Sequence, residues 1–138
     1  MSVLNIIICV DNKMGTMFNN RRQSRDRVLC RKIAEITNGS RLFVKSYSAE
    51  LFRQSDACVI CDDNYLMCAE NGDFCFVEGD ELLPYADRIE NIIICRWNRD
   101  YPGDKHFDID LSSGWKMDCV EEFPGSSHEK ITLERYVK

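Results

Sequence analysis

Histidines, long apolar runs and export signals are scarce or missing in this chain of 138 residues. It contains only two histidines, and imidazole is a common ligand in zinc sites. The apolar run Leu4–Val10 is far shorter than the ~20 residues that a membrane-spanning helix needs. The first residues show no charged segment followed by an apolar stretch and a small-residue cleavage site, so no secretory signal is indicated. We therefore expect a cytoplasmic protein with no membrane-embedded part.

An excess of positive charge is also absent. The formal net charge is -5, which disfavours loose binding to nucleic-acid phosphates. Basic residues are nevertheless concentrated in one segment, which comprises Arg21, Arg22, Arg25, Arg27, Arg31 and Lys32. Charge runs of this kind are usually solvated helix faces, and we prefer that interpretation. The alternative is a local anion site that contacts RNA through Arg21, Arg22 and Arg25.

Cysteines, in contrast, are numerous, with eight in the chain. Without an export signal we expect them to be reduced, and those within apolar runs, such as Cys9 and Cys75, to act as small apolar side chains. Cys58 and Cys61 have the spacing of a zinc knuckle, but there is no second close pair. Residues three apart on a strand also point to opposite faces. We therefore expect no metal site.

The apolar pattern predicts strands that alternate with helices. Residues 24–37 place Leu29, Ile33 and Ile36 on one helical face, with Ser24 or Asp26 as the N-cap. Further helices are expected at residues 48–52, opened by a hydroxyl cap, and at 81–90. The predicted strands cover residues 4–10, 41–45, 57–61, 74–77 and 91–97, followed by 114–123 and 131–136.

This order of elements predicts an α/β fold. Strands alternating with helices imply a mixed, mostly parallel central sheet with helices on both faces. The last two strands have no helix between them, so we expect an antiparallel pair at the C-terminal edge of the sheet. No repeat, low-complexity stretch or linker interrupts the chain, and one domain over residues 1–138 is predicted.

The order and spacing of these elements resemble the dihydrofolate reductase family. From Phe74 onward, the strand, helix, strand, turn at 103–107 and closing strand follow that family without a gap. Near the N-terminus, Asp11, Met14 and Gly15 match the first strand's end and the start of the mobile loop. The resemblance implies a substrate cleft at Val10, Met14, Gly15 and Cys95. It also implies a catalytic carboxylate at the first helix, where Asp26 is the candidate, although a helix-start residue that complements the helix dipole is the simpler interpretation.

The cofactor motifs of the family are altered in this chain. Lys45, Ser46, Tyr47 and Ser48 stand where the family has a Gly-Arg-x-Thr turn for NADPH. Glu78-Gly79 replaces a Gly-Gly pair beside the pyrophosphate, where a carboxylate has the wrong sign. Arg21-Arg22 replaces Pro-Trp in the mobile loop. The resemblance assigns cofactor contacts to Lys45, Ser46, Ser48 and Gly79, yet we expect no cofactor, with NADPH as the alternative.

Three hypotheses follow. The first is a divergent dihydrofolate reductase-like protein that has lost NADPH-dependent reduction and binds another small ligand or a protein partner. The second is a minimal NAD(P)H-dependent oxidoreductase of a pterin or related heterocycle, with Asp26 as the acidic anchor. The third is an RNA-binding or RNA-processing protein. His106 matches an aromatic or histidine position of the family's turn and is interpreted as structural. His128 is interpreted in the same way, because no strand-turn-helix nucleophile elbow surrounds it.

Overall fold

A seven-stranded sheet forms the centre of the computed structural model, which describes residues 3–138. The strand order is β5-β4-β6-β1-β7-β10-β9. The strands are β1 (Leu4–Val10), β4 (Arg41–Val44), β5 (Cys58–Cys61), β6 (Phe74–Val77), β7 (Ile89–Arg96), β9 (Lys116–Phe123) and β10 (Ile131–Val137). In this order, each strand from β5 through β4, β6 and β1 to β7 is parallel to the next. The strand β10 is antiparallel to both β7 and β9. The predicted fold class is therefore confirmed, including the antiparallel C-terminal pair.

Both faces of the sheet are covered. Alternate residues of β1 enter different cores: Ile6 and Ile8 pack on one side and Ile7 on the other, as the two-residue period of a strand requires. The helix α1 (Arg27–Ile36) and the 3-10 helix η1 (Ser46–Phe52) cover the face of Ile7. The short helix α2 (Tyr65–Cys68) and the 3-10 helix η2 (Leu83–Arg88) cover the opposite face.

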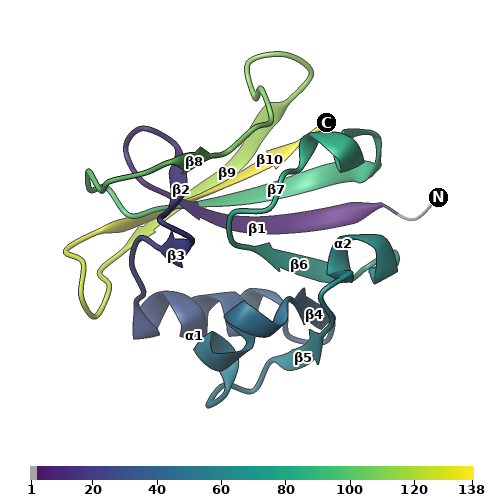
Figure 1. The fold of residues 1–138 in the computed structure, drawn as a ribbon, viewed down its shortest axis with the longest axis horizontal. Coiled ribbons are helices and arrows are strands. Elements are labelled where there is room, and N and C mark those ends of the chain that lie inside the picture. Colours follow the sequence, from purple (N-terminus) through teal and green to yellow (C-terminus); the bar gives the residue numbers. More distant parts are fainter. Residues whose placement is uncertain (1–2) are drawn as a thin grey trace.

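A second, smaller sheet was not predicted. The strands β2 (Gly15–Phe18), β3 (Arg21–Arg22) and β8 (Lys105–His106) pair antiparallel in the order β3-β2-β8. Figure 1 shows this sheet beyond the end of β1 that lies far from the N-terminus. It therefore folds the segments after β1 and β7 over the carboxyl ends of the parallel strands.

Two predicted helices differ from the structure. The expected helix at residues 81–90 is a 3-10 turn over Leu83–Arg88, because Pro84 stands in its first turn and Ile89 pairs with Leu4 in the β1-β7 ladder. The expected hydroxyl cap at Ser48 is wrong. Lys45 stands at the N-cap of η1 without a side-chain hydrogen bond, and the buried Ser48 hydroxyl donates to Glu78 instead.

The strand predicted at residues 57–61 is present but is not buried. It forms an edge of the large sheet as β5, and Cys58 and Cys61 are exposed. None of the helices within residues 3–138 has the length and apolar character needed to cross a membrane.

Candidate functional site

A cleft lies where the parallel strands β1, β6 and β7 end and α1 begins. The end of a parallel strand is the usual place for a ligand in an open α/β sheet. The segment that follows β3 forms one wall of the cleft. The lining residues are Cys9, Thr16, Arg22, Gln23, Ser24, Arg25, Asp26, Leu29, Cys30, Ile33, Leu51, Phe76, Val77, Glu78 and Trp97.

Asp26 is the N-cap of α1, which confirms one of the two predicted caps. Its side chain is fully buried, and each carboxylate oxygen accepts from three donors. Oδ1 accepts from the backbone N–H groups of Val28, Leu29 and Ser126 at 2.9, 3.2 and 3.0 Å. Oδ2 accepts from the backbone N–H and hydroxyl of Ser127 at 2.9 and 3.2 Å, and lies 3.1 Å from His128 Nδ1.

These contacts determine the ionisation of Asp26. Burial alone would raise the pKa of the carboxyl group, but hydrogen bonds from the Ser126 and Ser127 amides and from His128 outweigh burial and hold its pKa well below the usual range. Asp26 is therefore a carboxylate at neutral pH, and it serves as a charged acceptor at the base of the cleft.

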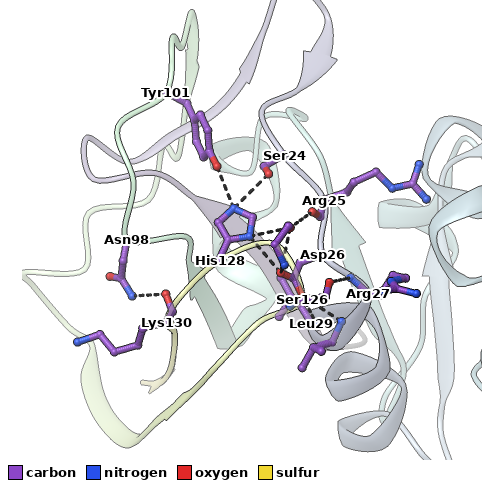
Figure 2. Close-up of polar contacts among 12 residues, drawn as sticks. Ser24, Arg25, Asp26, Arg27, Leu29, Asn98, Tyr101, Ser126, His128 and Lys130 are labelled. Carbon is purple, nitrogen blue, oxygen red and sulfur yellow. Dashed lines mark hydrogen bonds and ion pairs between the residues drawn. The ribbon is translucent and has the colours of Figure 1, made fainter.

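His128 connects Asp26 to two hydroxyl groups. Its Nε2 atom lies 3.2 Å from Ser24 Oγ and 2.9 Å from Tyr101 Oη. The indole of Trp97 stacks on the imidazole, with the ring centroids 4.5 Å apart. Figure 2 shows the two hydroxyl groups approaching the ring from the side opposite Asp26. The imidazole is buried, with 1% of its side chain exposed.

The hydrogen-bond network assigns the tautomer of the His128 ring. An ionised carboxylate can only accept, so the Nδ1 atom facing Asp26 carries the proton. In the neutral ring Nε2 then has a lone pair that accepts from a hydroxyl group. Ser24 and Tyr101 compete for that single lone pair.

Our sequence interpretation of His128 missed this arrangement. The histidine is 102 residues from Asp26, and a hairpin loop between β9 and β10 brings it to the start of α1. Gly125 permits the close approach, since a Cβ atom there would lie 2.9 Å from the Asp26 carboxyl carbon. The small residues Gly125, Ser126 and Ser127 before the histidine were the only signal in the sequence, and they do not identify their partner.

Two buried polar atoms at the cleft have no partner among residues 3–138. They are the hydroxyl oxygen of Thr16 and the side-chain carbonyl oxygen of Gln23. The Gln23 amide orientation is fixed, because Nε2 donates to Asp11 Oδ2 and to the carbonyl of Pro102, both at 3.2 Å. The carbonyl oxygen is therefore the atom left free. A buried polar atom without a partner costs about 1–3 kcal/mol, and both atoms belong to residues that line the cleft.

Glu78 and Arg22 form an ion pair across the cleft. The Arg22 guanidinium donates to both Glu78 oxygens, with Nε at 3.0 Å from Oε2 and Nη2 at 3.1 Å from Oε1. Glu78 also accepts from the Ser48 hydroxyl at 2.8 Å, and Arg22 contacts Glu50 at 3.0 Å. Arg22 and Glu78, which are 56 residues apart in the chain, thus meet in one contact.

The predicted cofactor residues contact protein groups. The Lys45 ammonium donates to the carbonyl of Glu78 at 2.5 Å and lies 3.3 Å from Asp80. Ser46 donates from its backbone N–H and its hydroxyl to Asp63. Gly79 has a φ of +82° and is covered by Met17, whose Sδ atom would lie 2.1 Å from a Cβ atom added there. The assignment of Lys45, Ser46, Ser48 and Gly79 to a cofactor remains a prediction.

The predicted substrate residues surround the cleft but do not line it. Val10 and Cys95 are fully buried in the two cores, and Met14 packs against the core of Val10. Gly15 donates its backbone N–H to Asp11 at 2.7 Å. Cys9 and Thr16, the chain neighbours of Val10 and Gly15, do line the cleft. The role of Val10, Met14, Gly15 and Cys95 in binding substrate remains a prediction.

The basic segment is divided by the fold. Arg22 pairs with Glu78 inside the cleft, and Lys32 pairs with Glu121 of β9 at 2.5 Å. Arg21 and Arg27 are exposed. Arg22 and Lys32 are thus engaged in ion pairs with carboxylates of this chain.

The fold is that of a known class of α/β proteins. A dihydrofolate reductase from Enterococcus faecalis, solved with NADP(H) and RAB-propyl, matches with a TM-score of 0.66 and 12% sequence identity, over 98% of this chain and 95% of that chain. No family model matches the sequence, and no curated protein matches it. The chain thus has a dihydrofolate reductase-like fold at very low sequence identity, as the resemblance predicted.

Proposed function

We propose that this protein uses a dihydrofolate reductase-like fold to bind a small polar ligand in the cleft and does not carry out NADPH-dependent reduction. The observation that carries the proposal is the pair of buried, unpartnered atoms, Thr16 Oγ1 and Gln23 Oε1, among the cleft residues. A ligand that donates to Gln23 and bonds to Thr16 satisfies both atoms.

The contacts around Glu78 argue against a dinucleotide. A pyrophosphate needs backbone N–H groups and positive charge around it. Here Glu78 and Asp80 place carboxylates in the segment that the resemblance assigns to the pyrophosphate, and Lys45 is engaged by that same segment. Met17 occupies the space against Gly79. The residues present do not fit this cofactor.

The contacts of Asp26 also argue against the minimal reductase. A carboxylate has about four lone-pair sites, and Asp26 already accepts from six donors. No acceptor capacity is left to hold the amino and imino nitrogens of a pterin. Asp26 instead positions His128.

The cleft defines the chemistry of the ligand. Leu29, Ile33 and Phe76 provide an apolar wall, and the Trp97 indole lies beside the imidazole of His128. The exposed Arg25 side chain stands among the polar lining residues. The chemistry of these polar and apolar groups matches a compact ring with an N–H donor, such as a pyrimidine, purine or pteridine. The cleft must widen to admit such a ring, because its accessible volume is about 20 Å³.

Thr16→Val tests the proposal with two effects of opposite sign. Removing a buried hydroxyl that has no partner should raise the free energy of unfolding of the unliganded protein by about 1 kcal/mol. The same change should weaken ligand binding about tenfold, because one ligand hydrogen bond is lost. Thermal unfolding in the presence of a panel of pteridines, purines and pyrimidines measures both effects.

Thr132→Val is the matched control, since Thr132 is equally buried but bonded to Asn98 and Glu122 outside the cleft. It should lower stability and leave the ligand shift unchanged. Equal binding by wild type and Thr16→Val, or no shift with any compound at millimolar concentration, would contradict the proposed site.

A further inference from the structure

We infer that Ser24 is a nucleophile activated by His128 and Asp26, and that the cleft hydrolyses a small carboxylic ester. Ser24 Oγ lies 3.2 Å from His128 Nε2, and His128 Nδ1 lies 3.1 Å from Asp26 Oδ2. This is the order of contacts, from nucleophile to base to orienting carboxylate, that activates serine in unrelated hydrolases. The inference rests on the proposed function, since the same cleft must admit the substrate.

The three groups differ in burial in the way that this chemistry requires. Asp26 and His128 have side chains that are 0% and 1% exposed, so the hydrogen bond between them is shielded from water and the ring is held in one orientation. Ser24 is partly exposed and lines the cleft. Its hydroxyl has no hydrogen-bond partner other than His128 among residues 3–138. The nucleophile is therefore accessible while its base is not.

The reaction balances without a cofactor. Ser24 Oγ forms a bond to the carbonyl carbon of the ester as its proton moves to His128 Nε2. The carbon–oxygen bond to the leaving alcohol breaks, and the alcohol takes the proton from Nε2. Water then attacks the acyl-serine, gives one proton to Nε2, and the proton returns to Ser24 Oγ as the acid leaves. The sum is ester and water to acid and alcohol.

The cleft contains groups that suit such a substrate. The backbone N–H groups of Ser24 and Arg25 donate to no group among residues 3–138, and they are our candidates for stabilising a developing oxyanion. The apolar side chains of Leu29 and Phe76 line the cleft beside Ser24 and would contact a short acyl chain. These features indicate an ester of a short carboxylic acid.

Tyr101 provides a specific control on the mechanism. Its hydroxyl is 2.9 Å from the same Nε2 atom and competes with Ser24 for the lone pair. Tyr101→Phe removes the competitor while retaining the ring. We therefore expect Ser24 to become more reactive in that variant, which a purely structural network would not produce.

Covalent labelling tests the inference. The folded protein is treated with methanesulfonyl fluoride and, separately, diisopropyl fluorophosphate, and the modified residue is located by peptide mass spectrometry. We expect one label per chain on Ser24, none in Ser24→Ala, and a rate lower by about 100-fold or more in His128→Gln. Tyr101→Phe should label several-fold faster. Ser113→Ala, a change in an exposed serine outside the cleft, should label like the wild type.

The outcomes separate this inference from the proposed function. A label on a residue other than Ser24 would overturn the assignment of Ser24 as the nucleophile. Absence of any label on wild-type protein that unfolds cooperatively would do the same. Neither result depends on whether the His128→Gln variant folds. A protein that binds a panel compound through Thr16 without a reactive Ser24 retains the proposed function and overturns only this inference. A labelled Ser24 in a protein that binds no panel compound supports the nucleophile and contradicts the proposed ligand chemistry.

Discussion

Asp26→Ala is expected to lower the free energy of unfolding by roughly 3–5 kcal/mol, because removing one member of a buried charged contact leaves the others without a partner. Six donors lose their acceptor, among them the Val28 and Leu29 amides at the start of α1 and the Nδ1 atom of His128. The change therefore affects the N-terminus of α1 and the 124–130 loop together. Urea unfolding at pH 7 measures the loss.

The contribution of Asp26 to the free energy of unfolding should depend on pH. The pKa of Asp26 is depressed in the folded protein, so its contribution to stability is present above the unfolded-state pKa of about 3.9 and is lost as the pH falls toward the folded pKa. The difference in the free energy of unfolding between wild type and Asp26→Ala should hence become smaller below about pH 4. Asp118→Ala, an exposed residue of β9, is the control. Two results would contradict the account. One is a difference in the free energy of unfolding between wild type and Asp26→Ala that stays constant down to pH 2. The other is a loss of stability in Asp26→Ala that is no larger than in Asp118→Ala.

Glu78→Ala should lower the free energy of unfolding by about 3 kcal/mol. It leaves the Arg22 guanidinium, whose side chain is 13% exposed, without its two-point partner. It also leaves the buried Ser48 hydroxyl without an acceptor. Chemical unfolding of the two proteins at the same pH and moderate salt measures the difference.

Glu50→Ala is a matched control, because Glu50 contacts the same Arg22 at 3.0 Å but its side chain is 48% exposed. Exposed pairs of this kind contribute about 0–1 kcal/mol. Replacing Arg22 and Glu78 together by leucine should be less damaging than Glu78→Ala, since no unpaired charge is left buried. Equal losses from Glu78→Ala and Glu50→Ala would show that burial does not determine the strength of this contact.

The sheet and the start of α1 could be predicted from the sequence because both depend on local patterns. The apolar run at Leu4–Val10 has the composition of a buried central strand, and it forms β1 with the predicted bounds. Asp26 before the amphipathic segment is a typical N-cap, and it caps α1. The predicted helix at 81–90 shows the limit of the method, because pairing of Ile89 with Leu4 overrides its helical spacing.

The contacts of the site could not be predicted because they join segments far apart in the chain. Periodicity does not indicate that His128 meets Asp26, 102 residues away, or that Arg22 meets Glu78, 56 residues away. The sequence alone indicates that Glu78 has the wrong charge for a phosphate, but it does not indicate that Arg22 is its partner. The structure joins the two residues in one ion pair.

The central claim is that the cleft of this dihydrofolate reductase-like fold does not hold a dinucleotide, and an NADPH titration tests it most directly. The emission of Trp97, which lines the cleft, and the thermal midpoint are followed together at moderate salt. We predict no saturable change in either signal up to millimolar NADPH. Saturable binding would raise stability by about 2.7 kcal/mol at a hundredfold excess over the dissociation constant, and that result would contradict the account.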